Sequence, residues 1–337
     1  YSHESERAMC AVLGAGACME CEVLSFTRLA GRLTDAAGGG AAPMLDAGGR
    51  MLLMYAALRR VAYSLSVYRA PSRKPAFLTE LLATVDECKS YCVTPEELMV
   101  AGDELGGRQG DKWRDIGVIY AAYQAMESQS AADPRSRLDR LAQQLKDTRW
   151  GAGMAFFVHG FTDFTPQEEQ VLAQLMVQGE LTAALLCDHG DDPADIFRPA
   201  LRSARRLVRL AREAGVGVRE ERLDRPLFQH PSLVFLEKKL FGDEPDKVWT
   251  GDHAVMRIRA GSPRQEAEWC AAEVLRLLRE EGCRCRDIAV CARRMDGYGE
   301  LIESVFERYG IPVFRSAMTD RKSVVWKSRC WPWSPPP

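Results

Sequence analysis

One stretch of the chain, residues 154–170, restricts the possible folds more than any other. The apolar run at 154–158 predicts a buried strand, which ends at His159-Gly160. A turn follows, and a helix is expected to begin at Thr165-Pro166, where a capping residue precedes a proline suited to the first helical position. Glu168 stands three residues after the threonine and completes a capping box. A strand that delivers polar residues into a turn and a helix is typical of nucleotide-binding α/β proteins.

The polar residues after this strand resemble part of a helicase motif. In DNA helicases of the UvrD type, the equivalent stretch reads Asp-Glu-x-x-Asp and is followed a few residues later by a glutamine. Asp163 and Gln167 match the end of that pattern. His159 and Gly160 stand where the acids that bind magnesium and polarise water would be. The stretch therefore predicts a degenerate magnesium-binding and ATPase strand, which keeps the helicase fold but lacks the acids that bind magnesium and polarise water.

The rest of the sequence alternates extended and helical patterns. Between residues 45 and 147, four apolar stripes at helical spacing predict a block of helices without a strand. Outside that block, further strands are expected at 21–25, 181–187, 255–259 and 287–291, and helices at 26–34, 199–214, around 267–278 and at 298–309.

These patterns predict an α/β fold made of P-loop helicase-like (RecA-like) parallel-sheet domains. The first domain is expected to comprise residues 1–44 and 148–245, with a large all-helical insertion at 45–147. The start of a second RecA-like domain is expected at 253–318. Residues 319–337 hold three tryptophans and a proline run without periodicity, and we expect a non-native or disordered tail there.

Overall charge and composition exclude several classes of protein. The formal net charge of the 337 residues is −2, so any DNA contact must come from local basic patches. No run approaches the roughly 18 apolar residues of a membrane span, and no secretory signal is present, so no membrane partner is expected. Eleven cysteines, an odd count at irregular spacing, indicate reduced thiols and a cytoplasmic protein.

Several kinds of catalytic site lack their defining residues. A P-loop needs a Gly-Lys pair to hold phosphates, and the sequence contains none. An esterase of the α/β-hydrolase type needs a Gly-x-Ser-x-Gly elbow, which is also absent. Cys18-x-x-Cys21 and Cys283-x-Cys285 each lack a second pair at zinc-binding spacing, and the five histidines are scattered. No catalytic residue, metal ligand or cofactor is therefore assigned within this chain.

Two local features could contact DNA. Ser25, Phe26 and Arg28 lie where an extended segment turns into a helix, and an exposed aromatic ring beside an arginine can stack a base and hold a phosphate of single-stranded DNA. The alternative is that Phe26 belongs to the core and Arg28 is an ordinary surface residue. The second feature is a basic stripe on one side of the helix at 199–214, which could follow a phosphate backbone or be a solvated face; it comprises Arg202, Arg205, Arg206, Arg209 and Arg212.

Taken together, the segments resemble the AddB subunit family of bacterial AddAB helicase–nucleases. The matching motifs follow one another in family order over about residues 6–314. They are EVLSFTRLAGRL at 22–33, LDAGGRMLLMYAAL at 45–58, VDECKSYCVTPEEL at 85–98, FFVHGFTDFTPQEEQVLAQLM at 156–176, SPRQEAEWCAAEVLRLLREEG at 262–282 and DIAVCARRMDGYGELIESVFERYGIPVF at 287–314.

The resemblance implies a helicase-like subunit without productive translocation. Such a subunit forms a heterodimer with an AddA-type helicase–nuclease, binds DNA, especially single-stranded DNA, and responds to Chi sequences during double-strand break repair by homologous recombination. The family implies ATP, Mg²⁺ and a 4Fe-4S cluster in parts that this chain does not cover. By position, Ser25, Phe26 and Arg28 match the family's SFxRLA segment, which supports their role in DNA binding.

The chain departs from the family pattern in ways that leave alternatives. We expect the family's P-loop upstream of Tyr1 and its nuclease domain downstream of Pro337. His159 replaces the aspartate that the family usually has before Gly160. The leading hypothesis is an inert DNA-binding and partner-binding scaffold. A truncated active UvrD-type helicase and a structural helical adaptor without DNA binding are the alternatives.

Overall fold

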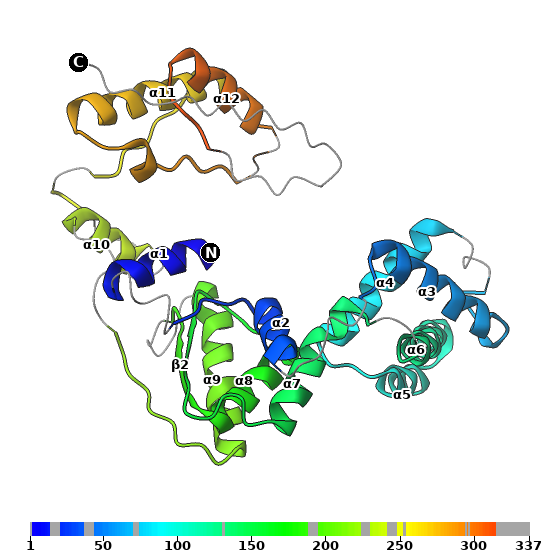
Figure 1. Ribbon diagram of the computed structural model, residues 1–337. Helices are drawn as coiled ribbons and strands as arrows, with labels where there is room; N and C mark the ends of the chain where they lie inside the picture. The colour runs from blue at the N-terminus through cyan, green and yellow to red at the C-terminus, as the bar shows by residue number, and fades with distance from the viewer. Residues whose placement is uncertain are drawn as a thin grey trace. The chain divides into compact units, whose positions relative to one another are not determined.

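The computed structural model (Figure 1) divides the chain into two units. The first comprises Tyr1–Arg225 and Lys238–Pro245, and the second Pro226–Glu237 and Asp246–Pro337. The predicted tail at 319–337 lies outside the described residues. The structure describes residues 2–13, 21–36, 44–69, 74–129, 132–187, 195–223, 230–240, 248–251, 254–293, 295 and 297–314.

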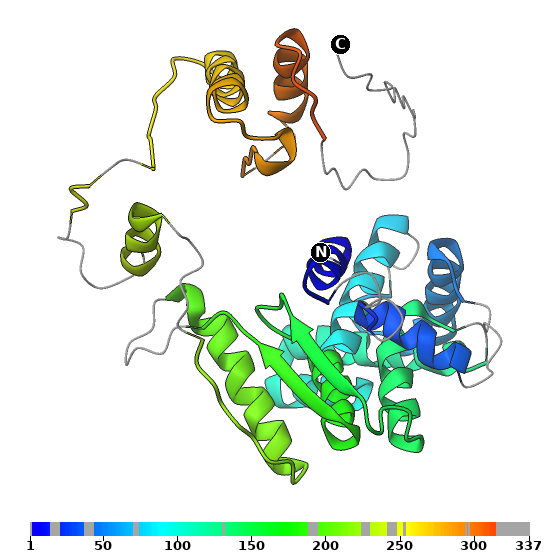
Figure 2. The ribbon, with the colours of Figure 1, turned by 60° about the vertical axis from the view of Figure 1, so that its left-hand side comes forward.

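The α/β body of the first unit is built on two parallel strands, β1 (Ala155–His159) and β2 (Glu180–Ala184), joined by α8 (Pro166–Gln178). Figure 2 shows the strands side by side. The start of α8 confirms the predicted capping box. The backbone N–H of Glu168 donates to Thr165 Oγ1 at 3.3 Å, and the backbone N–H of Thr165 donates to Glu168 Oε2 at 2.9 Å. Two backbone donors that the helix itself cannot use are thereby satisfied.

Three further helices complete the α/β body: α2 (Phe26–Ala36), α7 (Arg137–Asp147) and α9 (Arg198–Glu213). The predictions of helices at 26–34 and 199–214 are confirmed. Their apolar faces meet those of α8 in one core, formed by Ala30, Leu33, Leu141, Leu145, Phe164, Val171, Leu172, Leu175, Met176, Leu207 and Ala211. The α/β class is confirmed, although helices predominate and the described sheet has only two strands.

The sheet is covered on one face only within the described residues. Phe156, Val158 and Leu181 pack against the core of the α/β body, whereas the side chain of Phe157 is 77% exposed. Burial alternates along both strands, and no residue of β1 is fully buried. The prediction of a buried β1 is therefore wrong. Side chains alternate across a strand, so a continuous apolar run is buried only where both faces of the sheet are covered.

The helical module of the first unit comprises α3 (Ala47–Val61), α4 (Pro75–Ser90), α5 (Pro95–Leu105) and α6 (Gly107–Glu127). Its core is formed by Met54, Ala57, Leu58, Leu65, Leu78, Leu81, Leu82, Val85, Cys88, Leu98, Ile119, Tyr120 and Tyr123. The described residues of the predicted block at 45–147 form helices and no strand, and the last of these helices, α7, packs into the core of the α/β body. The chain enters and leaves the module at one point, where the backbone N–H of Leu45 donates to the carbonyl oxygen of Ala132 at 3.0 Å.

Helices α5 and α6 approach closely because glycines face each other. A Cβ added to Gly102 would lie 2.8 Å from the carbonyl oxygen of Gly110, and one added to Gly117 would lie 2.8 Å from the carbonyl oxygen of Pro95. Real Cβ atoms do not come so near to backbone atoms, so larger residues at these positions would force the helices apart. Glycine weakens a helix interior, and its presence here is explained by this contact.

The second unit contains all but the last two residues of α10 (Pro231–Lys239), and α11 (Pro263–Glu280) and α12 (Gly299–Arg308). Helices α11 and α12 share a core with Ile311, and both helices were expected from the sequence. The strands predicted at 255–259 and 287–291 are not formed, and both segments are mostly exposed. The strand predicted at 21–25 in the first unit is also absent. A strand depends on hydrogen bonds to a neighbour, and none of these segments has one among the described residues.

The remaining elements are one helix and several short turns. They are α1 (Ser2–Leu13) and the 3₁₀ turns η2 (Ala62–Ser64), η4 (Pro134–Ser136), η5 (Asp195–Phe197) and η6 (Cys285–Asp287). Across the described ranges, no helix combines the length and the apolar character that crossing a membrane requires.

Candidate nucleic-acid interface

The start of α2 and the loop after β1 lie together. The rings of Phe26 and Phe161 meet edge to face, with centroids 5.6 Å apart, and Phe161 in turn packs on Phe164 at 5.1 Å. Phe164 is buried, whereas Phe26 and Phe161 are half-buried. The structure thus brings the predicted DNA-binding segment of α2 to the carboxyl end of β1, a contact across 135 residues that the sequence did not indicate.

Ser25 and Arg28 already have partners inside the protein. The backbone N–H of Arg28 donates to Ser25 Oγ at 3.3 Å, so the serine caps α2. The guanidinium of Arg28 is exposed, and its Nη1 lies 3.5 Å from Glu6 Oε1 in α1. An exposed ion pair of this kind contributes about 0–1 kcal/mol, so Arg28 can exchange Glu6 for a phosphate at little cost.

The carboxyl end of β1 carries the imidazole of His159, and the loop after it carries the carboxylate of Asp163. His159 and Asp163 are both exposed, and Asp163 Oδ1 accepts a 3.4 Å hydrogen bond from the hydroxyl of Thr162. Gly160 adopts φ +83°, in the left-handed region that favours glycine, and this turns the chain away from the strand. No pair of carboxylates among the described residues faces the strand end, and pairs of this kind hold magnesium in motor sites.

Gln167 lies away from the loop after β1 and is buried between α8 and α7. Its Nε2 donates to Asp139 Oδ2 at 2.9 Å and to the carbonyl oxygen of Arg135 at 3.3 Å. Burial raises the pKa of Asp139, and the hydrogen bond from Gln167 offsets part of that rise. In the structure, Gln167 therefore holds two helices together, and its amide does not face the strand end.

The basic stripe on α9 is exposed along its whole length. Arg206 Nη1 lies 3.3 Å from Glu169 Oε1 of α8, and Arg209 Nε lies 3.8 Å from Glu213 Oε1. Arg202, Arg205 and Arg212 form no ion pair with another described residue. The buried residues of the helix, Ala200, Ser203, Leu207 and Ala211, lie on the opposite side.

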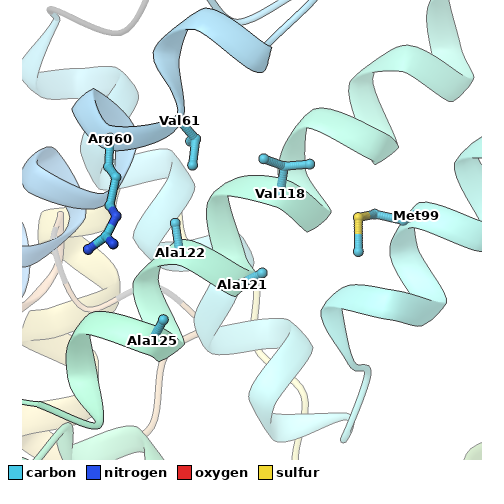
Figure 3. Close-up of a pocket in the computed structure, with 7 residues that line it drawn as sticks. All are labelled: Arg60, Val61, Met99, Val118, Ala121, Ala122 and Ala125. Carbon is cyan, nitrogen blue, oxygen red and sulfur yellow. The ribbon is translucent and has the colours of Figure 1, made fainter.

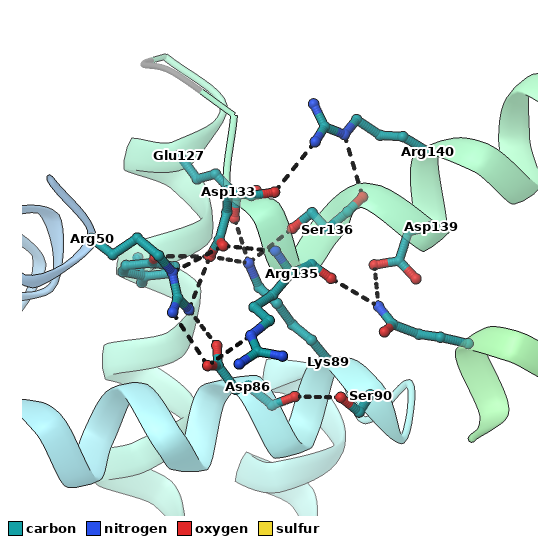
Figure 4. A network of polar contacts seen from close by, with 12 residues as sticks. Arg50, Asp86, Lys89, Ser90, Glu127, Asp133, Arg135, Ser136, Asp139 and Arg140 are labelled. Carbon is teal, nitrogen blue, oxygen red and sulfur yellow. Dashed lines mark hydrogen bonds and ion pairs between the residues drawn. The ribbon is translucent and has the colours of Figure 1, made fainter. Parts of the chain in front are cut away.

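A buried charge cluster, which sequence reasoning missed, lies where the helical module meets α7 (Figure 4). At its centre is Asp133, which has no exposed surface. Lys89 Nζ lies 2.9 Å from Asp133 Oδ2 and 2.7 Å from Glu127 Oε2. Arg50 Nε lies 3.0 Å from Asp133 Oδ1, and the terminal nitrogens of Arg50 bind Asp86. These partners lie up to 83 residues apart, and each resembles an ordinary surface charge in the sequence.

Hydrogen bonds complete the surroundings of Asp133. The hydroxyl of Tyr123 donates to Oδ2 at 2.8 Å, and the backbone N–H of Arg135 donates to Oδ1 at 2.9 Å. Burial by itself opposes ionisation of this carboxyl. The donors from Arg135, Lys89 and Tyr123 outweigh it and lower the pKa of Asp133. The cluster is thus a structural joint, in which every bound group stabilises the charged carboxylate.

An apolar depression in the helical module is the next candidate. It has a volume of about 360 Å³ and lies between α3, α5 and α6 (Figure 3). Its lining comprises Val61, Met99, Val118, Ala121, Ala122 and Ala125, with Arg60 as the charged residue. The lining has no acid and no nucleophile, so it lacks the groups that catalysis needs. Within the described ranges, no three His, Cys, Asp or Glu side chains gather in a way that could hold a metal ion.

Comparisons with known proteins agree with one another. The model of a family described as "ADDB, N-terminal" matches residues 1–237. A protein of Acetivibrio thermocellus, named as a subunit of an ATP-dependent helicase/deoxyribonuclease, is 32% identical over 332 residues, which cover 95% of this chain. Proteins of the same name from Heliobacterium modesticaldum and Moorella thermoacetica are 33% and 34% identical, over 92% and 87% of this chain. The chain spans 29%, 27% and 27% of the lengths of these three relatives.

Proposed function

The chain belongs to the family described as ADDB, N-terminal, and from this premise we propose that it is part of the AddB-type subunit of an ATP-dependent helicase/deoxyribonuclease. The subunit acts in double-strand break repair by homologous recombination. Within it, this chain is a DNA-binding, Chi-responsive scaffold whose ATPase site is degenerate. Its partner is an AddA-type helicase–nuclease subunit, and ATP, Mg²⁺ and the 4Fe-4S cluster belong to parts outside this chain.

The contact between Phe26 and Phe161 carries the proposal of DNA binding. It places a half-buried ring and the exposed guanidinium of Arg28 at the carboxyl end of β1. A base of single-stranded DNA would stack on the exposed edge of these rings, and Arg28 would hold the adjoining phosphate. The same place in a nucleotide-binding α/β protein receives the ligand.

Binding of a fluorescent single-stranded oligonucleotide by the 337-residue chain tests this proposal. Phe26→Ala should weaken binding by about 1–3 kcal/mol, the usual contribution of one stacked base. Arg28→Ala should weaken it and flatten the dependence of the logarithm of affinity on the logarithm of salt by about 0.7, since one phosphate contact is lost. The matched control is Arg32→Ala, because Arg32 is an exposed arginine of the same helix that pairs with Glu22 at 3.1 Å.

A substitution at Glu6 should raise the affinity for single-stranded DNA, the opposite of the effect expected at Arg28. Glu6→Gln removes the carboxylate that competes for Arg28, so single-stranded DNA should bind more tightly than to the parent chain. Glu22→Gln removes an equal charge beside Arg32 and controls for the change in net charge. Equal effects of the two glutamine substitutions would contradict a specific role for Arg28.

The degenerate ATPase site is supported by the positions of three residues. His159 and Gly160 stand at the end of β1, and the amide of Gln167 is bound to Asp139. Among the described residues, this strand end has no pair of carboxylates suited to hold magnesium against a triphosphate. We expect no ATP hydrolysis by the purified chain, with or without single-stranded DNA. Hydrolysis that DNA stimulates would favour the truncated active helicase instead.

One observation favours the structural adaptor as a second candidate. Ser25 caps α2, and Phe26 packs against the core of the α/β body, so both have a role without DNA. Identical DNA binding by the parent chain and by Phe26→Ala and Arg28→Ala would support the adaptor. We also propose that the α/β body is a RecA-like domain interrupted by the helical module, and that residues 253–318 begin a second one. The parallel β1–α8–β2 unit supports the proposal for the first domain.

A further inference from the structure

The arginine ridge of α9, defined as Arg202, Arg205, Arg206, Arg209 and Arg212, has no role in the proposed stacking site. The helix holds six arginines and one glutamate in 16 residues, in a chain whose formal net charge is −2. Positive charge is therefore concentrated on one element and balanced elsewhere. Such a concentration marks a surface that attracts a polyanion.

The direction of the ridge is fixed by the packing of the helix. Helix α9 packs on α8 through its small and apolar residues, among them Ala200, Ser203 and Leu207 (Figure 1). At 100° per residue, the five arginines fall on an arc opposite those residues. All five are exposed, so the ridge points away from the core of the α/β body.

The arrangement opposes the stability of the helix itself. Each arginine of the ridge has another arginine three or four residues away, and like charges at that spacing repel one another. Glu169 and Glu213 relieve the repulsion at Arg206 and Arg209. No described acid does so at Arg202, Arg205 or Arg212. An anionic ligand would remove the repulsion that the folded chain leaves in place.

The chemistry of the ridge selects a duplex over a single strand. Sites for single-stranded nucleic acid combine basic groups with aromatic rings, on which the bases stack. The ridge has no aromatic residue, because residues 202–212 comprise only Arg, Ser, Ala, Leu and Val. From Arg202 to Arg212 it extends about 15 Å, a length over which duplex DNA carries about nine phosphate charges.

We propose that the arginine ridge of α9 docks the phosphate backbone of a nucleic-acid duplex without reading its sequence. Arginines on a rigid helix bind phosphates through charge-assisted hydrogen bonds, and the absence of other polar groups on the ridge leaves the base edges unread. The proposal goes beyond the stacking site at Phe26 and rests on different residues, so either can fail alone.

The test compares a triple variant with a control of equal charge. Arg202→Gln, Arg205→Gln and Arg212→Gln remove the three arginines that have no acidic partner among the described residues. The control removes three exposed arginines on three other helices, Arg59, Arg108 and Arg279, also by glutamine. Fluorescence anisotropy measures binding of the 337-residue chain to a blunt DNA duplex of mixed sequence, to the matching RNA duplex and to the single DNA strand.

The triple variant should lose at least tenfold in affinity for the DNA duplex at about 50 mM salt, and its log–log salt slope should flatten by about 2.7 for three lost phosphate contacts. The control should stay within about twofold. Changing the same three arginines to lysine should preserve most of the affinity, because lysine also binds phosphate. A weaker effect on the RNA duplex than on the DNA duplex would assign the ridge to B-form DNA, and equal effects would assign it to either duplex.

Three outcomes would overturn the proposal. The first is an equal loss in the triple variant and its control. The second is a larger loss for the single strand than for the duplex, and the third is displacement of the duplex by polyglutamate as effectively as by unlabelled duplex. Thermal unfolding adds a readout, since the triple variant should melt at or above the temperature of the parent chain. Phe26→Ala, measured on the same probes, should affect the single strand alone and so separates the two sites.

Discussion

The helical module and the α/β body differ in where they place their charged side chains. In the module, Asp133 and Lys89 are buried and paired, and thirteen apolar side chains form a closed core around α3 to α6. In the α/β body, the arginines of α9 are exposed, and the sheet shows the ring of Phe157 on its outer face. The module is stabilised by these inner contacts, although it also exposes large apolar side chains, among them Leu52 and Tyr63. The body presents surfaces that would be stabilised by something bound to them.

Removing Asp133 should have the largest effect and would break the module. Asp133→Ala leaves Lys89 and Arg50 buried without their shared partner, and breaking a buried ion pair in this way costs about 3–5 kcal/mol. Hydrogen exchange followed by mass spectrometry should show lost protection in α4 and α6. The control is Asp103→Ala, whose exposed pair with Arg114 should contribute little. Equal protection in both variants would show that the cluster does not hold the module together.

A substitution at the α5–α6 contact should have the next largest effect. Gly102→Ala places a Cβ against the backbone carbonyl of Gly110, and such overpacking costs about 1–3 kcal/mol. In the α/β body, the equivalent change, Gly31→Ala in α2, meets nothing within 4 Å. Alanine favours helix over glycine, so Gly31→Ala should raise stability by about 0.5–1 kcal/mol. Urea unfolding measured by circular dichroism gives both values, and two changes of the same sign would contradict the packing described for the module.

These contrasts also explain what the sequence could and could not predict. The caps of α8 and the apolar face of α11 are local patterns, so the helices were placed within a few residues. The strands at 21–25, 255–259 and 287–291 were wrong, because an apolar run becomes a strand only beside a partner, and the sequence pattern does not supply the partner. In the module, the absence of strands from the described residues was predicted, whereas no apolar stripe was predicted for α5.

The candidate site divides in the same manner. The exposure of the α9 arginines follows from helical periodicity and was predicted as a stripe. The contact of Phe26 with Phe161 and the pairing of Arg50 with Asp133 join residues far apart in the chain. Nothing in the sequence around Gln167 indicated that its side chain would be bound by Asp139, because that bond depends on how α7 packs against α8.

Lowering the pH should destabilise the helical module at Asp133 and stabilise the α7–α8 contact of the α/β body at Asp139. The pKa of Asp133 is lowered in the folded module, so its contribution to stability is present above the ordinary aspartate pKa of about 3.9 and is lost as pH falls through the folded value. The pKa of Asp139 is raised by burial, so its ionised form opposes folding, and that opposition disappears as pH falls through its folded pKa. Hydrogen exchange followed from neutral pH to below the ordinary aspartate pKa should therefore show α7–α8 gaining protection first, and α4 and α6 losing it only at the acidic end. Asp139→Asn should abolish the gain and leave the loss unchanged.

A substitution on the outer face of the sheet should have the smallest effect on stability, and it tests whether that face is uncovered. Phe157 is exposed, so Phe157→Thr should change the free energy of unfolding by less than about 0.5 kcal/mol. Phe156 packs toward Trp150, with ring centroids 6.4 Å apart, on the inner face of the same strand, and Phe156→Thr should destabilise by several times more. Equal losses, measured by urea unfolding, would mean that something in the protein covers the outer face and that the body is as closed as the module. A loss of stability in the Phe156 variant alone would show that the outer face of the sheet is uncovered. Parallel sheets are usually covered on both faces, so this face would still need a further layer to be buried.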